Sequence, residues 1–249
     1  MIPKIIHYIW FGSNPYSEKI KYCIESWKKY LPEYEFMLWN ENSFDVNSVE
    51  FTKQAYENKK WAFVSDYVRV WALNKYGGVY LDTDVEIRKP LDTFLNHDMV
   101  LGTDERGNLT AFMASIPNHP LWENLLNVYQ HTSFKKEDGS LNQTVNNLYI
   151  QDVLKEWGYQ EANKFQSIEK GIVIYPDEWF HAVDHMSGIQ HITVNTYAIH
   201  WHTLTWTSNQ SKIKRFIRTK LLAKIIGGQN ASALFFKLSS LKNKFVCKG

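Results

Sequence analysis

Residues 79–84, with the sequence Val-Tyr-Leu-Asp-Thr-Asp, limit the possible fold and chemistry of this chain more than any other segment. A run of strand-forming hydrophobic residues ends in two aspartates one residue apart. Alternate side chains of a β-strand point to the same side, so Asp82 and Asp84 can converge where the strand gives way to a loop. Two converging carboxylates suit a hard divalent cation that also holds phosphate oxygens. Because an aspartate pair at a strand end is also common in turns and helix caps, the neighbouring residues must decide.

The segment just upstream adds a second pair of charged residues. The apolar spacing over 61–76 predicts a helix, and Gly77 and Gly78 can end it in the left-handed conformation. Asp66 and Arg69 are three residues apart and share a face of that helix. Alone, they would indicate a surface ion pair of small energetic value. Because their helix comes just before the strand that carries the aspartate pair, they instead favour a polar pocket.

The rest of the chain alternates between strand and helix patterns. We expect further strands at 4–10, 34–39, 99–102, 110–115, 172–175 and 193–201, and further helices at 16–30, 47–59, 120–130 and 142–157. This alternation predicts an α/β fold with a mostly parallel central sheet covered by helices. Ligands bind such sheets at the carboxyl ends of the strands, where Trp10 would meet Asp82 and Asp84.

Four blocks of sequence, in a fixed order, resemble a known family. Residues 2–10, 65–69, 77–84 and 90–92 look like the signature blocks of the DXD-type sugar transferases of glycosyltransferase family 32 type, and 198–200 with Trp206 resembles the closing block. That group includes the yeast initiating α-1,6-mannosyltransferase and bacterial capsule and lipopolysaccharide transferases, and is distantly similar to the clostridial glucosylating toxins. The resemblance implies a GT-A fold, a nucleotide-sugar donor, Mn²⁺ (or Mg²⁺) and retention of anomeric configuration.

The resemblance also assigns roles at the centre of the expected site. Asp84 would be a direct metal ligand, and Asp82 would reach the metal through water or hold ribose and sugar hydroxyls. The metal would neutralise the diphosphate leaving group. Asp66 and Arg69 match positions that hold the donor sugar, since a carboxylate accepts from hydroxyls and an arginine fork can pin it or a phosphate.

Aromatic residues and histidines complete the expected donor site. Trp10, after Ile9 at the end of the first strand, could stack on a nucleobase or belong to the core, and Tyr80 could lie against the donor or in the core. The family's closing block has histidines at positions corresponding to 200 and 201; here His200 is followed by tryptophan and then His202. Either histidine is a candidate metal ligand. Trp206 matches the tryptophan of the family's closing block, which in relatives lies near the diphosphate of the donor.

Other polar residues carry weaker signals. Asp104 and Asn108 lie in a loop expected to open on the same cleft, as do Gln143 and Thr144, and could meet the acceptor. His7, inside the first strand, is expected to be a hydrogen-bonded core residue. The remaining histidines at 181, 185 and 191 have no regular spacing and are expected at the surface.

Composition limits the class of protein. The chain has 249 residues, 44% hydrophobic and 22% charged, which predicts a globular domain. Its two cysteines, Cys23 and Cys247, form neither a disulfide framework nor a zinc site, which favours a reducing cytosol. We see no signal peptide and no run of ~18 apolar residues that could span a membrane. We expect a cytoplasmic protein, which could also lie at the inner face of the plasma membrane.

Charge divides the chain into a catalytic domain, 1–208, and a basic tail, 209–249. Residues 186–249 hold ten of the 28 basic residues and none of the 26 acidic ones. Leu234, Leu238, Leu241 and Phe245 form one stripe of a helix among lysines. Such a helix could dock on an anionic membrane surface, or pack on the domain with its lysines in solvent.

These observations predict a metal-dependent, retaining hexosyltransferase. We expect a UDP-sugar donor (galactose, glucose or N-acetylhexosamine) and, as acceptor, a glycan or lipid-linked glycan hydroxyl of a capsule or lipopolysaccharide precursor, with no nucleic-acid partner. An aspartyl-nucleophile phosphatase is a weaker hypothesis, because its D-x-D motif follows the first strand, and this one comes at residue 82. Two further hypotheses are a toxin-like protein glycosyltransferase and a non-enzymatic module that binds membranes or nucleic acid.

Overall fold

The computed structural model describes residues 1–185 and 188–203 of the chain. Trp206, Cys247 and the tail 209–249 lie outside the described residues. The expected role of Trp206, the amphipathic stripe and its docking on a membrane therefore stay predictions. In the described part of the chain, no helix combines the length and apolar character needed to cross a bilayer.

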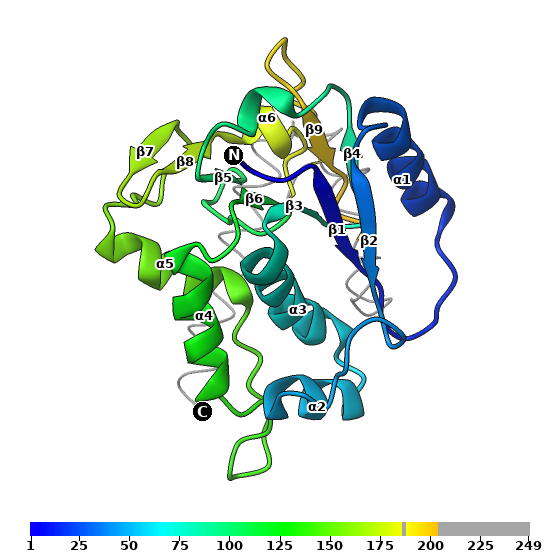
Figure 1. The fold of residues 1–249 in the computed structure, drawn as a ribbon, viewed down its shortest axis with the longest axis vertical. Helices are drawn as coiled ribbons and strands as arrows, with labels where there is room; N and C mark the ends of the chain where they lie inside the picture. The colour runs from blue at the N-terminus through cyan, green and yellow to red at the C-terminus, as the bar shows by residue number, and fades with distance from the viewer. Residues whose placement is uncertain (186–187, 204–249) are drawn as a thin grey trace, which may run out of the picture.

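A seven-stranded sheet forms the centre of the described residues, in the order β2-β1-β3-β6-β5-β8-β7 (Figure 1). The strands are β1 (Ile5–Ile9), β2 (Glu35–Trp39), β3 (Gly78–Leu81), β5 (Met99–Gly102), β6 (Phe112–Ser115), β7 (Gln166–Ile168) and β8 (Ile172–Tyr175). β6 and β7 run opposite to the other five, because each pairs antiparallel with its neighbours. The predicted α/β class with a mostly parallel sheet is confirmed.

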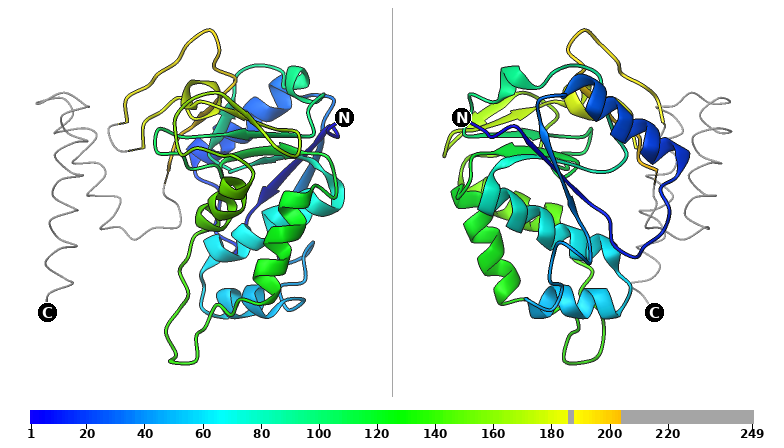
Figure 2. Two further views of the ribbon diagram at one scale, coloured as in Figure 1. Left: turned by 90° about the vertical axis from the view of Figure 1, so that its left-hand side faces the viewer. Right: turned by 45° about the vertical axis from the view of Figure 1, so that its right-hand side comes forward.

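Helices cover both faces of this sheet (Figure 2). One face carries α2 (Glu50–Glu57), α3 (Trp61–Tyr76), α4 (Pro120–Gln130) and α5 (Asn146–Glu156), and the other carries α1 (Glu18–Tyr30) and α6 (Asp177–Phe180), with a short 3₁₀ turn, η1 (Asp92–Phe94). The alternation along β3 shows how the layers are filled: Tyr80 belongs to the core under α3, while Val79 and Leu81 belong to the core on the opposite face.

A second, two-stranded sheet brings distant parts of the chain together. β4 (Val85–Ile87) follows the aspartate pair at once and pairs antiparallel with β9 (Ala198–His200). In this register Val85 lies opposite His200. The small sheet therefore fixes His200 beside Asp82 and Asp84, although more than a hundred residues separate them in sequence.

Several element boundaries differ from the prediction. The helix expected at 142–157 begins only at Asn146, because Val145 has the extended conformation of a residue that precedes a helix. The strand expected at 193–201 is reduced to β9, because the Thr196 hydroxyl bonds the Thr193 backbone N–H and holds the preceding segment in a turn. Two short strands, β4 and β7, were not predicted at all, since three-residue strands carry little periodic signal.

Candidate active site

The aspartate pair reaches the sheet edge through a sharp turn after α3. Gly77 and Gly78 have φ of 63° and 97°, the left-handed region that favours glycine. A Cβ on Gly77 would lie 2.7 Å from the backbone nitrogen of Pro117, and one on Gly78 would lie 2.8 Å from the carbonyl oxygen of Ile5. Both conformation and space therefore require glycine here, and the turn feeds the chain directly into the buried strand β3.

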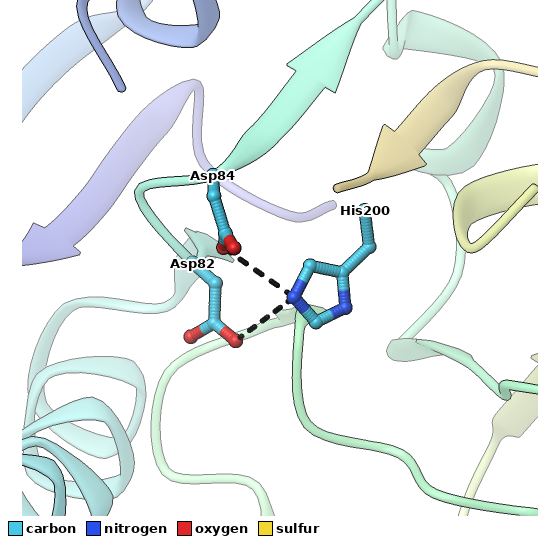
Figure 3. A group of neighbouring side chains, drawn as sticks. All are labelled: Asp82, Asp84 and His200. Carbon is cyan, nitrogen blue, oxygen red and sulfur yellow. Dashed lines mark ion pairs between the residues drawn. The ribbon is translucent and has the colours of Figure 1, made fainter. Parts of the chain in front are cut away.

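Asp82, Asp84 and His200 converge at the end of β3 (Figure 3). Their ligand atoms lie within 4.8 Å of one another, and the His200 Nε2 is 3.3 Å from Asp84 Oδ1 and 3.9 Å from Asp82 Oδ2. Two carboxylates and an imidazole form a donor set that suits a divalent cation. The buried Nδ1 of His200 has no hydrogen-bond partner among the described residues.

The protein holds Asp84 in place by its second oxygen. Asp84 Oδ2 accepts from the backbone N–H of Thr203 at 2.6 Å and from its hydroxyl at 2.9 Å, and the Asp84 carbonyl accepts from Trp201 N–H. Burial opposes ionisation of this carboxyl, but His200 and Thr203 outweigh it and hold the pKa of Asp84 below its usual range. Burial likewise opposes the charged form of His200, and Asp84 with Asp82 raises its pKa.

Asp66 and Arg69 form a second polar group beside this cluster. The Arg69 guanidinium lies 3.1 Å from Asp66 Oδ1 and 3.5 Å from Asp82 Oδ1, and it stacks over the Tyr80 ring with its carbon 4.6 Å from the ring centroid. The Tyr80 hydroxyl donates to Asp82 Oδ1 at 2.6 Å. Burial raises the pKa of Asp66 to about 6 despite the arginine. These residues are enclosed and not the exposed ion pair that the spacing alone would indicate.

Both groups line one cavity of about 410 Å³. Ile9 and Trp10 reach it from the end of β1. Trp10 is half-buried: its indole N–H donates to the Asn14 carbonyl at 2.7 Å, and its ring meets Tyr16 edge-on at 5.0 Å. The ring therefore lies on the cavity wall and not in the packed core, which leaves room for the predicted stacking.

The loop after β5 opens on the cavity, as the sequence predicts, and its polar side chains are hydrogen-bonded within the protein. Asp104 and Asn108 do line the cavity. However, Asp104 Oδ1 accepts from the backbone N–H groups of Arg106 and Asn108, and its Oδ2 accepts from the Asn108 side chain at 2.7 Å. Asn108 Oδ1 in turn accepts from Asn147. The structure thus uses both residues to hold the loop, which is the role that a hydrogen-bonded aspartate turn supplies.

The histidines depart from expectation. His202 is buried with its Nε2 3.1 Å from the Val183 carbonyl, and its ring lies 3.8 Å from that of His200, but it is not among the three converging ligands. His181 was expected at the surface. This was wrong: it is 3% exposed, lines the cavity, and burial lowers its pKa to about 4. His185 also lines the cavity, whereas His191 is exposed as expected.

Asn146 is a cavity residue that the sequence did not reveal. It is the first residue of α5; its backbone N–H and side-chain amide reach Asp66 Oδ2 and the Asp66 carbonyl, and its buried Oδ1 has no partner among the described residues. An asparagine in a run of polar residues carries no signal of its own. Only the packing of α5 against α3 places it beside Asp66.

Comparison with known proteins identifies this arrangement. Residues 17–101, from the start of α1 to the end of β5, match the family described as "Glycosyltransferase sugar-binding region containing DXD motif". This stretch of the chain is therefore similar to the sugar-binding region of DXD glycosyltransferases. The matched region contains Asp66, Arg69, Asp82 and Asp84, so the predicted family is confirmed on the residues that suggested it.

Proteins similar to this chain are found in fungi and in a virus. Inositol phosphoceramide mannosyltransferase 3 of Schizosaccharomyces pombe is 33% identical over 124 residues, which are 48% of this chain and 35% of that protein. The chain thus spans about a third of that relative's length. The uncharacterized glycosyltransferase L373 of Acanthamoeba polyphaga mimivirus is 24% identical over 91% of this chain and 92% of its own. Among solved structures, PaToxG glycosyltransferase gives a TM-score of 0.48 at 21% identity, covering 62% of this chain and 69% of that one.

Proposed function

We propose that this glycosyltransferase domain moves a hexose from a nucleoside-diphosphate sugar to a hydroxyl group, with retention of configuration, and that it depends on Mn²⁺. The observation that carries the proposal is the convergence of Asp82, Asp84 and His200 in the same cavity as the Asp66–Arg69 pair and Trp10. Bound there, the metal would neutralise the diphosphate as it leaves. An imidazole ligand beside two carboxylates supports Mn²⁺ over Mg²⁺, which prefers oxygen.

The chain's own residues would position the donor. Trp10 offers a π face to the base, and Asp66, held by Arg69 and the start of α5, offers carboxylate oxygens to sugar hydroxyls. Arg69 also keeps Asp82 oriented while Tyr80 donates to the same oxygen. In the reaction the bond from the anomeric carbon to the diphosphate breaks, a bond to the acceptor oxygen forms, and we propose that the departing phosphate takes the acceptor proton.

The acceptor is the least constrained part of the proposal. The sequence predicted a capsule or lipopolysaccharide precursor, while the curated relative is named an inositol phosphoceramide mannosyltransferase. That name brings mannose into the donor panel and a phosphorylated lipid headgroup into the acceptor panel. A hydroxyl on a glycan or on a glycolipid headgroup is consistent both with the acceptor that the sequence predicts and with the name of the fungal relative.

The test is a screen of hydrolysis and transfer with UDP- and GDP-hexoses in the presence of Mn²⁺. We expect one donor to be turned over, and turnover to stop when a chelator removes the metal. The Asp84→Asn variant serves as the inactive control. Release of inorganic phosphate from a phosphomonoester, with no turnover of any nucleotide sugar, would instead support the aspartyl phosphatase hypothesis.

A further inference from the structure

His181 is a buried histidine, and neither ring nitrogen makes a hydrogen bond of ordinary length and angle to another described residue, although the ring lies close enough to the Gly102 backbone for that group to raise its pKa. It follows α6, is 3% exposed and lines the cavity. Its ring packs edge-on against His200 with centroids 5.6 Å apart, and a Cβ added to Gly102 would lie 3.2 Å from it. The ring is therefore held tightly by its neighbours, while its nitrogens lack well-formed hydrogen bonds within the described residues.

Other buried histidines in this chain are paired. His7 Nε2 lies 2.7 Å from the Gly77 carbonyl and its Nδ1 accepts from Trp39. His119 Nε2 lies 2.9 Å from the Lys170 carbonyl and its Nδ1 accepts from the Leu121 N–H. An unpaired buried polar group destabilises a fold, and an apolar side chain of similar size would avoid that cost. His181 differs from His7 and His119 in facing the cavity, where a ligand can supply the missing partner.

The sheet order shows which part of a substrate would arrive there. Trp10 follows β1, Asp82 and Asp84 follow β3, and His181 packs against Gly102 at the end of β5. These three strands run in the same direction, in the order β1, β3, β5 with β6 between the last two. A nucleotide sugar with its base at Trp10 and its diphosphate at the aspartates would therefore extend its hexose, and the acceptor, toward the β5 end.

We propose that His181 hydrogen-bonds a sugar hydroxyl of the substrate and contributes to sugar specificity. This rests on the proposed function. A neutral imidazole carries one donor and one acceptor, which is the pair of functions that a hydroxyl group also has. Asp104, one of several weak acceptor candidates from the sequence, has both carboxylate oxygens hydrogen-bonded within its own loop.

The first experiment measures binding and needs no catalysis. The affinities of the nucleoside diphosphate and of the corresponding nucleoside-diphosphate hexose are measured by calorimetry with Mn²⁺, for the wild type and for His181→Leu and His181→Gln. If His181 contacts the donor hexose, His181→Leu should weaken hexose-donor binding about 3- to 10-fold and leave the diphosphate unchanged. His181→Gln, which keeps a donor and an acceptor, should recover part of the loss.

The second experiment distinguishes the donor from the acceptor. If the contact is to the acceptor, His181→Leu should leave donor binding and donor hydrolysis unchanged and raise the acceptor KM by a similar factor. Melting temperatures provide the control: His181→Leu should be at least as stable as the wild type, whereas His119→Leu should be less stable with unchanged sugar affinity.

The outcomes separate this inference from the function beneath it. A folded His181→Leu variant with wild-type donor affinity and wild-type acceptor KM would overturn the role of His181 and leave the transferase intact. A wild-type protein that neither binds nor turns over any nucleotide sugar with Mn²⁺ would overturn the proposed function, and this inference with it.

Discussion

Asp84 and Asp104 stand in comparable places and have different environments. Each follows a buried strand, β3 or β5, and each lines the same cavity. Asp84 has one oxygen bound by Thr203 and the other aimed at His200 in a cluster of ligand atoms. Asp104 has both oxygens occupied by N–H groups of its own loop. The difference between a site carboxylate and a structural one therefore lies in whether the fold itself occupies both oxygens.

The histidines repeat this comparison. His7 has both nitrogens bound within the core, and its burial lowers its pKa to about 4. His200 presents its Nε2 to two carboxylates, and the ring nitrogens of His181 make no well-formed hydrogen bond within the described residues. We therefore expect substitutions of internally bound groups to change stability, and substitutions of groups that face the cavity to change activity.

The largest expected effect is on catalysis at the aspartate pair. Asp84→Asn removes one charge from the proposed metal site at constant volume, and a bound cation supplies several kcal/mol of transition-state stabilisation. We expect turnover to fall about 10³-fold, with little change in melting temperature because the amide oxygen can still accept from Thr203. Initial rates over a range of Mn²⁺ concentrations check this. Wild-type turnover at saturating Mn²⁺ would show that Asp84 is not a ligand.

The next effect is on the pH dependence of stability through His7. An unfolded histidine titrates near 6.5, and folded His7 titrates at about 4, so between these values the unfolded state binds the extra proton. Stability from this residue is complete above pH 6.5 and is lost as the pH falls toward 4, on the order of 3 kcal/mol.

Urea unfolding at several pH values measures this contribution. His7→Gln keeps one donor for Gly77 and one acceptor for Trp39 but does not titrate, so its unfolding free energy should fall less steeply with acid. The difference between the two curves isolates His7 from the carboxylates. Parallel curves for wild type and variant would mean that His7 is not held neutral in the fold.

A smaller effect is expected at Asp104. Asp104→Asn replaces an acceptor with an amide that faces the Asn108 side-chain amide, and it removes the charge from bonds to two backbone N–H groups. Hydrogen bonds to charged groups contribute about 1.5–3 kcal/mol each, so we expect a loss of stability in that range and only a small change in donor hydrolysis. A stable variant with a raised acceptor KM would restore the acceptor role that the sequence predicted.

The sequence predicted the fold and the centre of the site because both are local in the chain. Asp66, Arg69, Asp82 and Asp84 fall within one helix, one turn and one strand end, so the spacing alone relates them. The helices α3 and α4 and the strands β5 and β8 have the predicted bounds. Such segments are defined by their own periodicity and by their glycine or proline ends.

What the sequence could not show depends on contacts between distant segments. His200 reaches Asp84 only through the pairing of β4 with β9, and these three-residue strands have no periodicity to reveal them. His181 is buried because α6 packs on β9 and β5, and nothing near it in the chain signals this. The occupied oxygens of Asp104 depend on the conformation of its loop. An aspartate at a strand end fits either role until that conformation is known.

Trp10 belongs to both classes of this comparison. Its indole N–H is hydrogen-bonded within the protein, but its ring faces the cavity. Base stacking contributes on the order of 1–3 kcal/mol, so Trp10→Leu should weaken donor binding by about 5- to 150-fold. Trp10→Phe keeps a π face and loses only the bond to Asn14, so it should retain most of the affinity. Calorimetry with the nucleoside diphosphate and Mn²⁺ measures both variants. If Trp10→Leu instead lowers the melting temperature and binds the diphosphate as the wild type does, the ring serves packing against Tyr16 and the base must bind elsewhere.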